Sequence, residues 1–208
     1  MIAYAIKAAI GTGLFEHVLV TTDDEEIAAI SRQYGAETPF MRPPELADDH
    51  TPTIPVVAHA IEACQLLGWQ IEFACCIYPT VPFIQIADIE AAWDLLKISD
   101  ANFSFPVAEF PSAIQRALKS GDRGCMAPFN PAYELTRTQD LEPAYFDAGQ
   151  FYWGDVHAWL TKAKLHSGGV GLRIPSWRVV DIDTGEDWVR AELIHGALTK
   201  KIANDSQH

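Results

Sequence analysis

The 208-residue sequence is poor in basic residues and has no long apolar run. Its 15 lysines and arginines are outnumbered by 28 aspartates and glutamates, which gives a formal net charge of −13. Nucleic acids and anionic membranes are bound through basic clusters, so such partners are not expected. No apolar run approaches the ~20 residues that cross a bilayer. A membrane span is therefore not expected either.

Cysteine and histidine are present but lack metal-site spacing. The four cysteines (Cys64, Cys75, Cys76 and Cys125) show no CxxC motif, and the seven histidines show no HxxxH pair. A histidine-based zinc site is therefore not expected. Neighbouring residues on a strand point to opposite faces, which places Cys75 and Cys76 on different sides. We expect buried free thiols, as is typical of a cytoplasmic protein.

A glycine-rich phosphate loop is also missing from the sequence. The chain opens on an apolar helical pattern from Met1 to Ile10, which Gly11 and Gly13 end, and no strand precedes it. Phosphate-handling α/β domains usually begin with a strand and a glycine-rich turn whose N–H groups hold the anion. The sequence therefore reads as though it starts one element late.

The rest of the chain alternates between strand and helix patterns. Expected strands cover 17–22, 73–78, 102–107 and 150–154, and expected helices cover 23–34, 54–67, 87–96, 155–162 and 187–198. This rhythm predicts one α/β domain over residues 1–208 with a mostly parallel, doubly wound sheet. Ligands of such sheets bind outside the carboxyl ends of strands, which puts residues 22–23, 78–82 and 181–183 along one rim.

Two segments break the alternation. Residues 168–175 are expected to form a loop. The segment of about 109–149 is rich in Pro, Arg, Gln and turn residues, and it is too long for an idle loop in a compact domain. We expect it to be a protruding hairpin or arm that packs on a second subunit.

The stretch 179–184 (VVDIDT) is the most informative motif. Residues 178–180 are typical of the start of a strand, on which Asp181 and Asp183 share a face while Ile182 points into the core. Two adjacent carboxylates repel each other unless a cation lies between them. Mg²⁺ typically takes one or two carboxylates and completes its shell with water and substrate phosphates.

A second interpretation of the two aspartates stays open. Thr184 is a helix cap with Asp187 in the capping-box position, and negative charge is favourable at a helix N-terminus. The pair could therefore be a solvated feature of the cap. The spacing alone does not separate this from a metal site.

Six segments, in order along nearly the whole chain, resemble the family of CMP–sugar-acid cytidylyltransferases. They are VTTDDEEIA (20–28), RPPELADD (42–49), CCIYPTVPF (75–83), FPSAIQRAL (110–118), FDAGQFYWG (146–154) and VVDIDTGEDW (179–188). RPPEL and DIDT are shared across the family, whereas IQRAL and DAGQFYW are similar to the branch that acts on pseudaminic acid. The CMP-N-acetylneuraminate synthetases are the neighbouring branch.

The resemblance implies a Rossmann-like nucleotidyltransferase fold and a homodimer whose arms cross at the partner's site. It also implies the reaction, in which the anomeric hydroxyl of a nine-carbon sugar acid attacks the α-phosphate of CTP and pyrophosphate leaves. In-line displacement of this kind needs charge neutralisation and alignment more than covalent help. Asp181 and Asp183 match the family's Mg²⁺-binding aspartates, in agreement with the argument from strand spacing.

The resemblance assigns nucleotide contacts to Asp23, Arg42, Thr53 and Thr80. Arg42 matches an arginine that contacts cytosine, and Thr53 matches a small hydroxyl residue near the base. The alternative for Arg42 is an ion pair within its loop, to Glu45 or Asp48.

Sugar contacts are assigned to Tyr78, Gln150 and Tyr152, and to Arg116 and Arg137 on the arm. A guanidinium fork suits a carboxylate or phosphate. Aromatic core packing is the alternative for the tyrosines, and ion pairs along the arm are the alternative for the arginines.

Two departures from the sialic-acid pattern bear on the substrate and the activity. Val81 and Phe83 stand where that branch has Ser and Arg, which argues against sialic acid itself. The family's ARxGSKxxxxKN loop, which holds the triphosphate, has no counterpart, and Lys7 is the first basic residue. A misassigned start codon, a fragment or a true truncation would each explain this. An enzyme of nucleotide-sugar synthesis is expected, and a non-catalytic relic that serves as a dimerisation or sugar-acid-binding module is the alternative.

Overall fold

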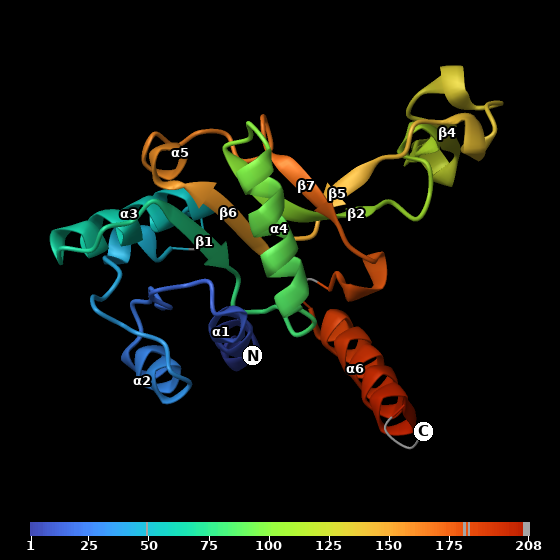
Figure 1. Ribbon diagram of the computed structural model, residues 1–208. Coiled ribbons are helices and arrows are strands. Elements are labelled where there is room, and N and C mark those ends of the chain that lie inside the picture. Colours follow the sequence, from blue (N-terminus) through green and yellow to red (C-terminus); the bar gives the residue numbers. More distant parts are fainter. Residues whose placement is uncertain (49, 181, 183, 206–208) are drawn as a thin grey trace.

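A five-stranded sheet forms the centre of the fold (Figure 1). The computed structural model describes residues 1–205 apart from 49, 181 and 183, with side chains as far as Leu198. The sheet contains β1 (Phe73–Ile77), β2 (Phe103–Glu109), β5 (Tyr145–Asp147), β6 (Phe151–Asp155) and β7 (Val170–Arg173). The helices are α1 (Ile2–Thr12), α2 (Glu25–Gln33), α3 (Thr53–Leu66), α4 (Ile86–Ile98), α5 (Val156–Leu160) and α6 (Gly185–Asp205).

The sheet is mixed, so the prediction of a mostly parallel sheet was wrong. Neighbours along the order β1-β6-β2-β5 are all antiparallel, and β7 pairs with β2 in parallel. The sheet is mixed because residues 145–155 run antiparallel to β2. This segment pairs with β2 first as β5 and then as β6, and β6 also pairs with β1. A bulge at residues 148–150 separates β5 from β6, and Gly149 there has a φ of +61°.

Three local predictions are also corrected. Residues 17–22 lie outside the sheet and form only a bridge between Leu19 and Glu37. The predicted loop 168–175 contains β7, in which Gly171 is a packing residue, because a Cβ there would lie 2.9 Å from the Val107 side chain. The predicted strand start at 178–180 is instead the end of a 3₁₀ turn, η6 (Ser176–Arg178), and residues 179 and 180 after it are not part of a strand.

Helices cover both faces of the sheet. On one face α1 and α4 pack against Phe151 and Trp153 of β6, and on the other α3 and α5 pack around Phe103, Tyr152 and Trp159. Successive β6 side chains thus enter opposite cores, as strand geometry requires. Within the described residues, no helix is long and apolar enough to cross a membrane.

The cysteines agree in part with the prediction of buried thiols. All four are free. Cys75 and Cys76 pack into opposite cores, as predicted from their adjacency. Burial raises the pKa of Cys76 to about 12, so its thiol stays protonated at neutral pH. Cys125 differs from the prediction, since it is exposed on the segment that projects from the sheet.

Residues 110–144 project from the sheet as a separate arm (Figure 1). The arm contains a two-stranded ribbon, β3 (Leu118–Ser120) paired with β4 (Met126–Pro128), and four 3₁₀ turns, η2 (Ile114–Arg116), η3 (Asp122–Gly124), η4 (Pro131–Tyr133) and η5 (Thr138–Asp140). The predicted hairpin is therefore present, and it is shorter than the segment 109–149 because β5 returns to the central sheet at Tyr145.

Candidate functional site

A cavity of about 440 Å³ lies where β1 ends. Its lining includes Thr53 at the start of α3, Tyr78 directly after β1, Tyr152 on β6, and the loop side chains of Lys164, His166 and Ser167. The carboxyl end of a strand in an open α/β sheet is where ligands of such folds bind. An apolar and aromatic wall with a few convergent polar groups is typical of a small-molecule site.

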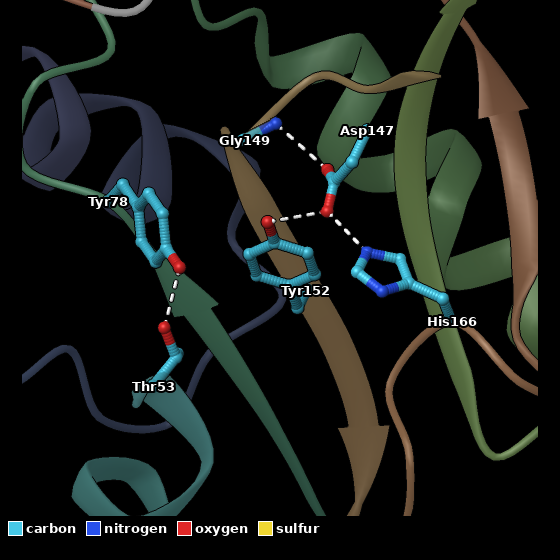
Figure 2. Close-up of polar contacts among 6 residues, drawn as sticks. All are labelled: Thr53, Tyr78, Asp147, Gly149, Tyr152 and His166. Atoms are coloured by element: carbon cyan, nitrogen blue, oxygen red, sulfur yellow. Dashed lines mark hydrogen bonds and ion pairs between the residues drawn. The ribbon is translucent and has the colours of Figure 1, made fainter. Parts of the chain in front are cut away.

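Two tyrosines form one wall of the cavity. The Tyr78 and Tyr152 rings meet edge-on with their centroids 5.5 Å apart. The Tyr78 hydroxyl lies 2.5 Å from Thr53 Oγ1 (Figure 2). This bond ties the end of β1 to the first turn of α3, so the two elements hold the wall in place.

Asp147 holds two of the cavity-lining side chains, Tyr152 and His166, from behind the lining (Figure 2). The bulge between β5 and β6 brings its carboxylate to Tyr152, whose hydroxyl donates to Oδ2 at 2.8 Å. The same oxygen lies 2.6 Å from His166 Nε2, and Oδ1 accepts from the backbone N–H of Gly149 at 2.9 Å. The Asp147 side chain is only 24% exposed, and its three partners give both carboxylate oxygens hydrogen bonds.

The Tyr152 phenol is held in its protonated form. Burial raises its pKa most, and the nearby Asp147 carboxylate and Tyr78 raise it further. The hydroxyl therefore remains a donor to Asp147 at every physiological pH.

The structure brings together three of the predicted site residues, Thr53, Tyr78 and Tyr152. Gln150 is 4% exposed and turns away from this cavity, with its Nε2 donating to the Arg178 carbonyl at 2.9 Å. Thr80 and Asp23 are exposed in the loops after β1 and before α2. Val81 and Phe83, which differ from the sialic-acid pattern, are core residues at 4% and 3% exposure and do not line the cavity.

Arg42 is held by the backbone carbonyls of residues 21 and 22. Its guanidinium donates to the carbonyl of Thr21, and its own N–H donates to the carbonyl of Thr22 at 2.8 Å. In the part of the chain that the structure describes, it makes no ion pair with Glu45 or Asp48. The loop ion pair that was its alternative is therefore wrong.

Both arm arginines are exposed. Arg137 pairs with Asp140 at 3.0 Å, which is the ion pair along the arm that was its alternative. Arg116 has a long contact of 3.5 Å with Thr138 Oγ1. Neither lines the cavity of this single chain.

The predicted metal ligands Asp181 and Asp183 lie outside the described residues, but the backbone around them is anchored. Arg178 forms a two-bond ion pair with Asp88 of α4, at 2.5 Å and 3.2 Å, and both side chains are at most 15% exposed. Ile182 packs against the core as predicted, and the Thr184 hydroxyl donates to Asp187 at 2.6 Å in the predicted capping box. Elsewhere among the described residues, no group of three or more potential metal ligands occurs.

Sequence reasoning missed Asp147, Lys164 and His166. Asp147 stands inside the DAGQFYW motif, and the glycine two residues on signals a turn that an aspartate caps. His166 is a lone histidine in a loop, and only the fold brings it next to Asp147, 19 residues earlier. No pattern in the sequence marks that contact.

Comparisons with known proteins show the family of the chain. The profile of a family described as Cytidylyltransferase matches residues 1–122. A pseudaminic acid cytidylyltransferase of Campylobacter jejuni is 35% identical over 198 residues, which cover 94% of this chain and 84% of the relative. A Helicobacter pylori protein that combines pseudaminic acid cytidylyltransferase with a UDP-sugar hydrolase is 32% identical over 184 residues, which cover 88% of this chain and 35% of that protein.

The fold is also similar to a solved structure. CMP:2-keto-3-deoxy-manno-octonic acid synthetase, complexed with CTP, superimposes with a TM-score of 0.66 over 94% of this chain and 88% of the other, at 12% identity. At that identity the likeness establishes a shared fold.

Proposed function

Because the chain belongs to the cytidylyltransferase family, we propose that it transfers CMP from CTP to a nine-carbon sugar acid, namely pseudaminic acid, and releases pyrophosphate. The observation that carries the proposal is the identity to pseudaminic acid cytidylyltransferases along nearly the whole chain. The cavity at the end of β1 supports it, since it is large enough for a sugar and carries hydroxyl, ammonium and imidazole groups.

In this reaction the anomeric oxygen of the sugar acid bonds to the α-phosphorus of CTP. The bond from that phosphorus to the bridging oxygen breaks, pyrophosphate takes the electron pair, and the attacking hydroxyl gives up its proton to water. The protein's task is to align the two reactants and to offset charge. We assign Thr53, Tyr78 and Tyr152 to the wall that orients the sugar, and Arg42, Thr80 and Asp23 to the nucleotide.

We propose that Asp181 and Asp183 hold Mg²⁺. Two carboxylates suit this ion, which completes its shell with phosphate oxygens and water. When bound, Mg²⁺ neutralises negative charge that builds up on the phosphates. Within the described residues, the Arg178–Asp88 ion pair and the hydrogen bond from Gln150 to Arg178 fix the segment that leads to these aspartates. We therefore assign Gln150 to positioning this segment.

The reaction product tests the proposed function. Incubation with CTP, Mg²⁺ and pseudaminic acid should give a CMP–pseudaminic acid conjugate, detected by mass spectrometry and by ³¹P NMR as a phosphodiester. UTP, ATP and GTP should give little product. A folded protein that forms no conjugate with any of the four nucleotides would contradict the proposal.

We further propose that the arm joins two chains and brings Arg116 and Arg137 to the partner's sugar acid. The ribbon register places Leu118 and Met126 on one face, at 61% and 64% exposure, and Leu135 nearby in the sequence is 96% exposed. Apolar side chains gathered on a protruding element are typical of an interaction surface.

The double variant Leu118→Glu/Met126→Glu should convert a dimer into a monomer, because it places two charges in the proposed interface. Size-exclusion chromatography with light scattering measures the mass. Leu66→Glu is the matched control, since Leu66 is 90% exposed at the end of α3, and it should leave the dimer intact. A wild-type monomer, or a dimer that persists in the double variant, would refute the arm interface.

A further inference from the structure

His166 is held in a defined orientation at the cavity. Its side chain is 65% exposed, yet its Nε2 lies 2.6 Å from Asp147 Oδ2, and its ring meets Phe105 edge-on at 5.3 Å and 90°. The hydrogen bond and the ring contact together restrain the imidazole. The ring is therefore oriented although it is largely open to solvent.

The partners of Asp147 fix which histidine nitrogen carries the proton. Asp147 Oδ1 accepts from the Gly149 N–H, and Oδ2 accepts from the Tyr152 hydroxyl. A carboxylate in this network can only accept, so its bond to His166 requires a proton on Nε2. In the neutral ring Nδ1 is then an acceptor. Among the residues that the structure describes, Nδ1 has no hydrogen-bond partner.

The other polar side chains that line the cavity are hydroxyls and one ammonium group, so among the described lining residues His166 supplies the acceptor nitrogen. The Thr53 and Tyr78 hydroxyls bond to each other, the Tyr152 hydroxyl is bonded to Asp147, and the Ser167 hydroxyl also lines the cavity. Lys164 lines the cavity but can only donate. A sugar acid presents hydroxyl and acylamino donors, and an unpaired acceptor nitrogen at the cavity complements them.

We propose that His166 Nδ1 is a direct hydrogen-bond contact to the sugar acid, and that Asp147 is the positioning residue that sets its orientation and tautomer. This rests on the proposed function, since the cavity must be the sugar-acid site. Tyr152 extends the same network, so one carboxylate couples the cavity wall to the recognition group.

Two amide variants separate a substrate contact from a structural role. The amide of His166→Gln lies near the position of Nε2, so it preserves the bond to Asp147 and removes the group at Nδ1. The amide of His166→Asn lies near the position of Nδ1, so it keeps an acceptor there and loses the bond to Asp147. Losing one hydrogen bond to the substrate should raise the KM for pseudaminic acid about 10-fold in His166→Gln. The KM for CTP should not change in that variant. His166→Asn keeps an acceptor near the position of Nδ1 but loses the bond to Asp147 that positions it, so its KM for pseudaminic acid should rise less, about threefold.

Steady-state kinetics with pseudaminic acid and CTP, and calorimetric titration with pseudaminic acid, measure these effects. The reverse order, with His166→Asn impaired and His166→Gln normal, would show that His166 only holds Asp147 and would overturn the proposal. Two normal variants, or a His166→Gln variant that loses its fold, would overturn it as well. A wild-type protein that binds pseudaminic acid without turnover would refute the proposed function instead, and the titration would still test His166.

Discussion

Asp181→Asn and Asp183→Asn should each lower Mg²⁺-dependent turnover by about 100-fold to 1,000-fold, while the protein keeps its fold. Each change keeps the side-chain volume and removes one negative charge from the proposed metal site. The ion would then bind weakly, and the negative charge on the reacting phosphates would be poorly offset. Pyrophosphate release at several Mg²⁺ concentrations measures the loss, and circular dichroism checks the fold.

Glu186→Gln is the matched control for these variants. Glu186 is an exposed carboxylate in the first turn of α6, close in sequence to both aspartates. It should leave turnover unchanged, which separates a metal ligand from a general effect of charge. Full activity in either aspartate variant, or unfolding of both, would contradict the metal assignment and favour a helix-cap role for the pair.

Trp159→Ala should destabilise the protein by about 3–5 kcal/mol, the largest effect on folding that we expect. Trp159 is fully buried on α5, its ring meets Phe103 edge-on at 4.9 Å, and its Nε1 donates to the Ala74 carbonyl at 3.2 Å. Truncation leaves a large cavity against the face of the sheet that carries Tyr152 and removes the side-chain hydrogen bond to the Ala74 carbonyl of β1. Urea unfolding, followed by far-UV circular dichroism, measures the change.

Trp177→Ala provides the comparison, because Trp177 is 46% exposed in η6. Removing it should cost about 1 kcal/mol or less, since surface substitutions away from special features have small effects. Equal losses of stability in the two variants would show that burial around Trp159 is not what stabilises this layer.

The elements with a clear local pattern were predictable from the sequence. The apolar run at β1, the helical spacing of α3 and α4, and the cap formed by Thr184 and Asp187 all appear where they were expected. These features depend on neighbours within one or two turns of the chain, and the sequence records such neighbours directly.

Strand direction and pairing were not predictable in the same way. The antiparallel entry of β6 between β1 and β2 depends on partners far apart in the chain. Gly168 and Gly169 precede β7 and Gly171 lies within it, so the segment has the composition of a loop, whereas Gly171 is required by the close approach of Val107. Residues 17–22 have strand composition, but composition does not say whether a strand joins the central sheet.

Some residues of the candidate site were predictable from local motifs, and others became visible only in the fold. Tyr78, Tyr152 and Thr53 were found through motifs, and the fold places them around one cavity. Asp147 and His166 became visible only through the bulge that aims one at the other. Gln150 was assigned to the sugar because of its motif, but it lies in the bulge before β6 and its side chain donates to the Arg178 carbonyl.

The most direct test of the account is pyrophosphate release from CTP and Mg²⁺, with pseudaminic acid and N-acetylneuraminic acid offered in parallel. We expect release with pseudaminic acid and little or none with N-acetylneuraminic acid. Release with N-acetylneuraminic acid alone would contradict the assigned substrate, and a folded protein that is silent with both acids would contradict the assigned activity.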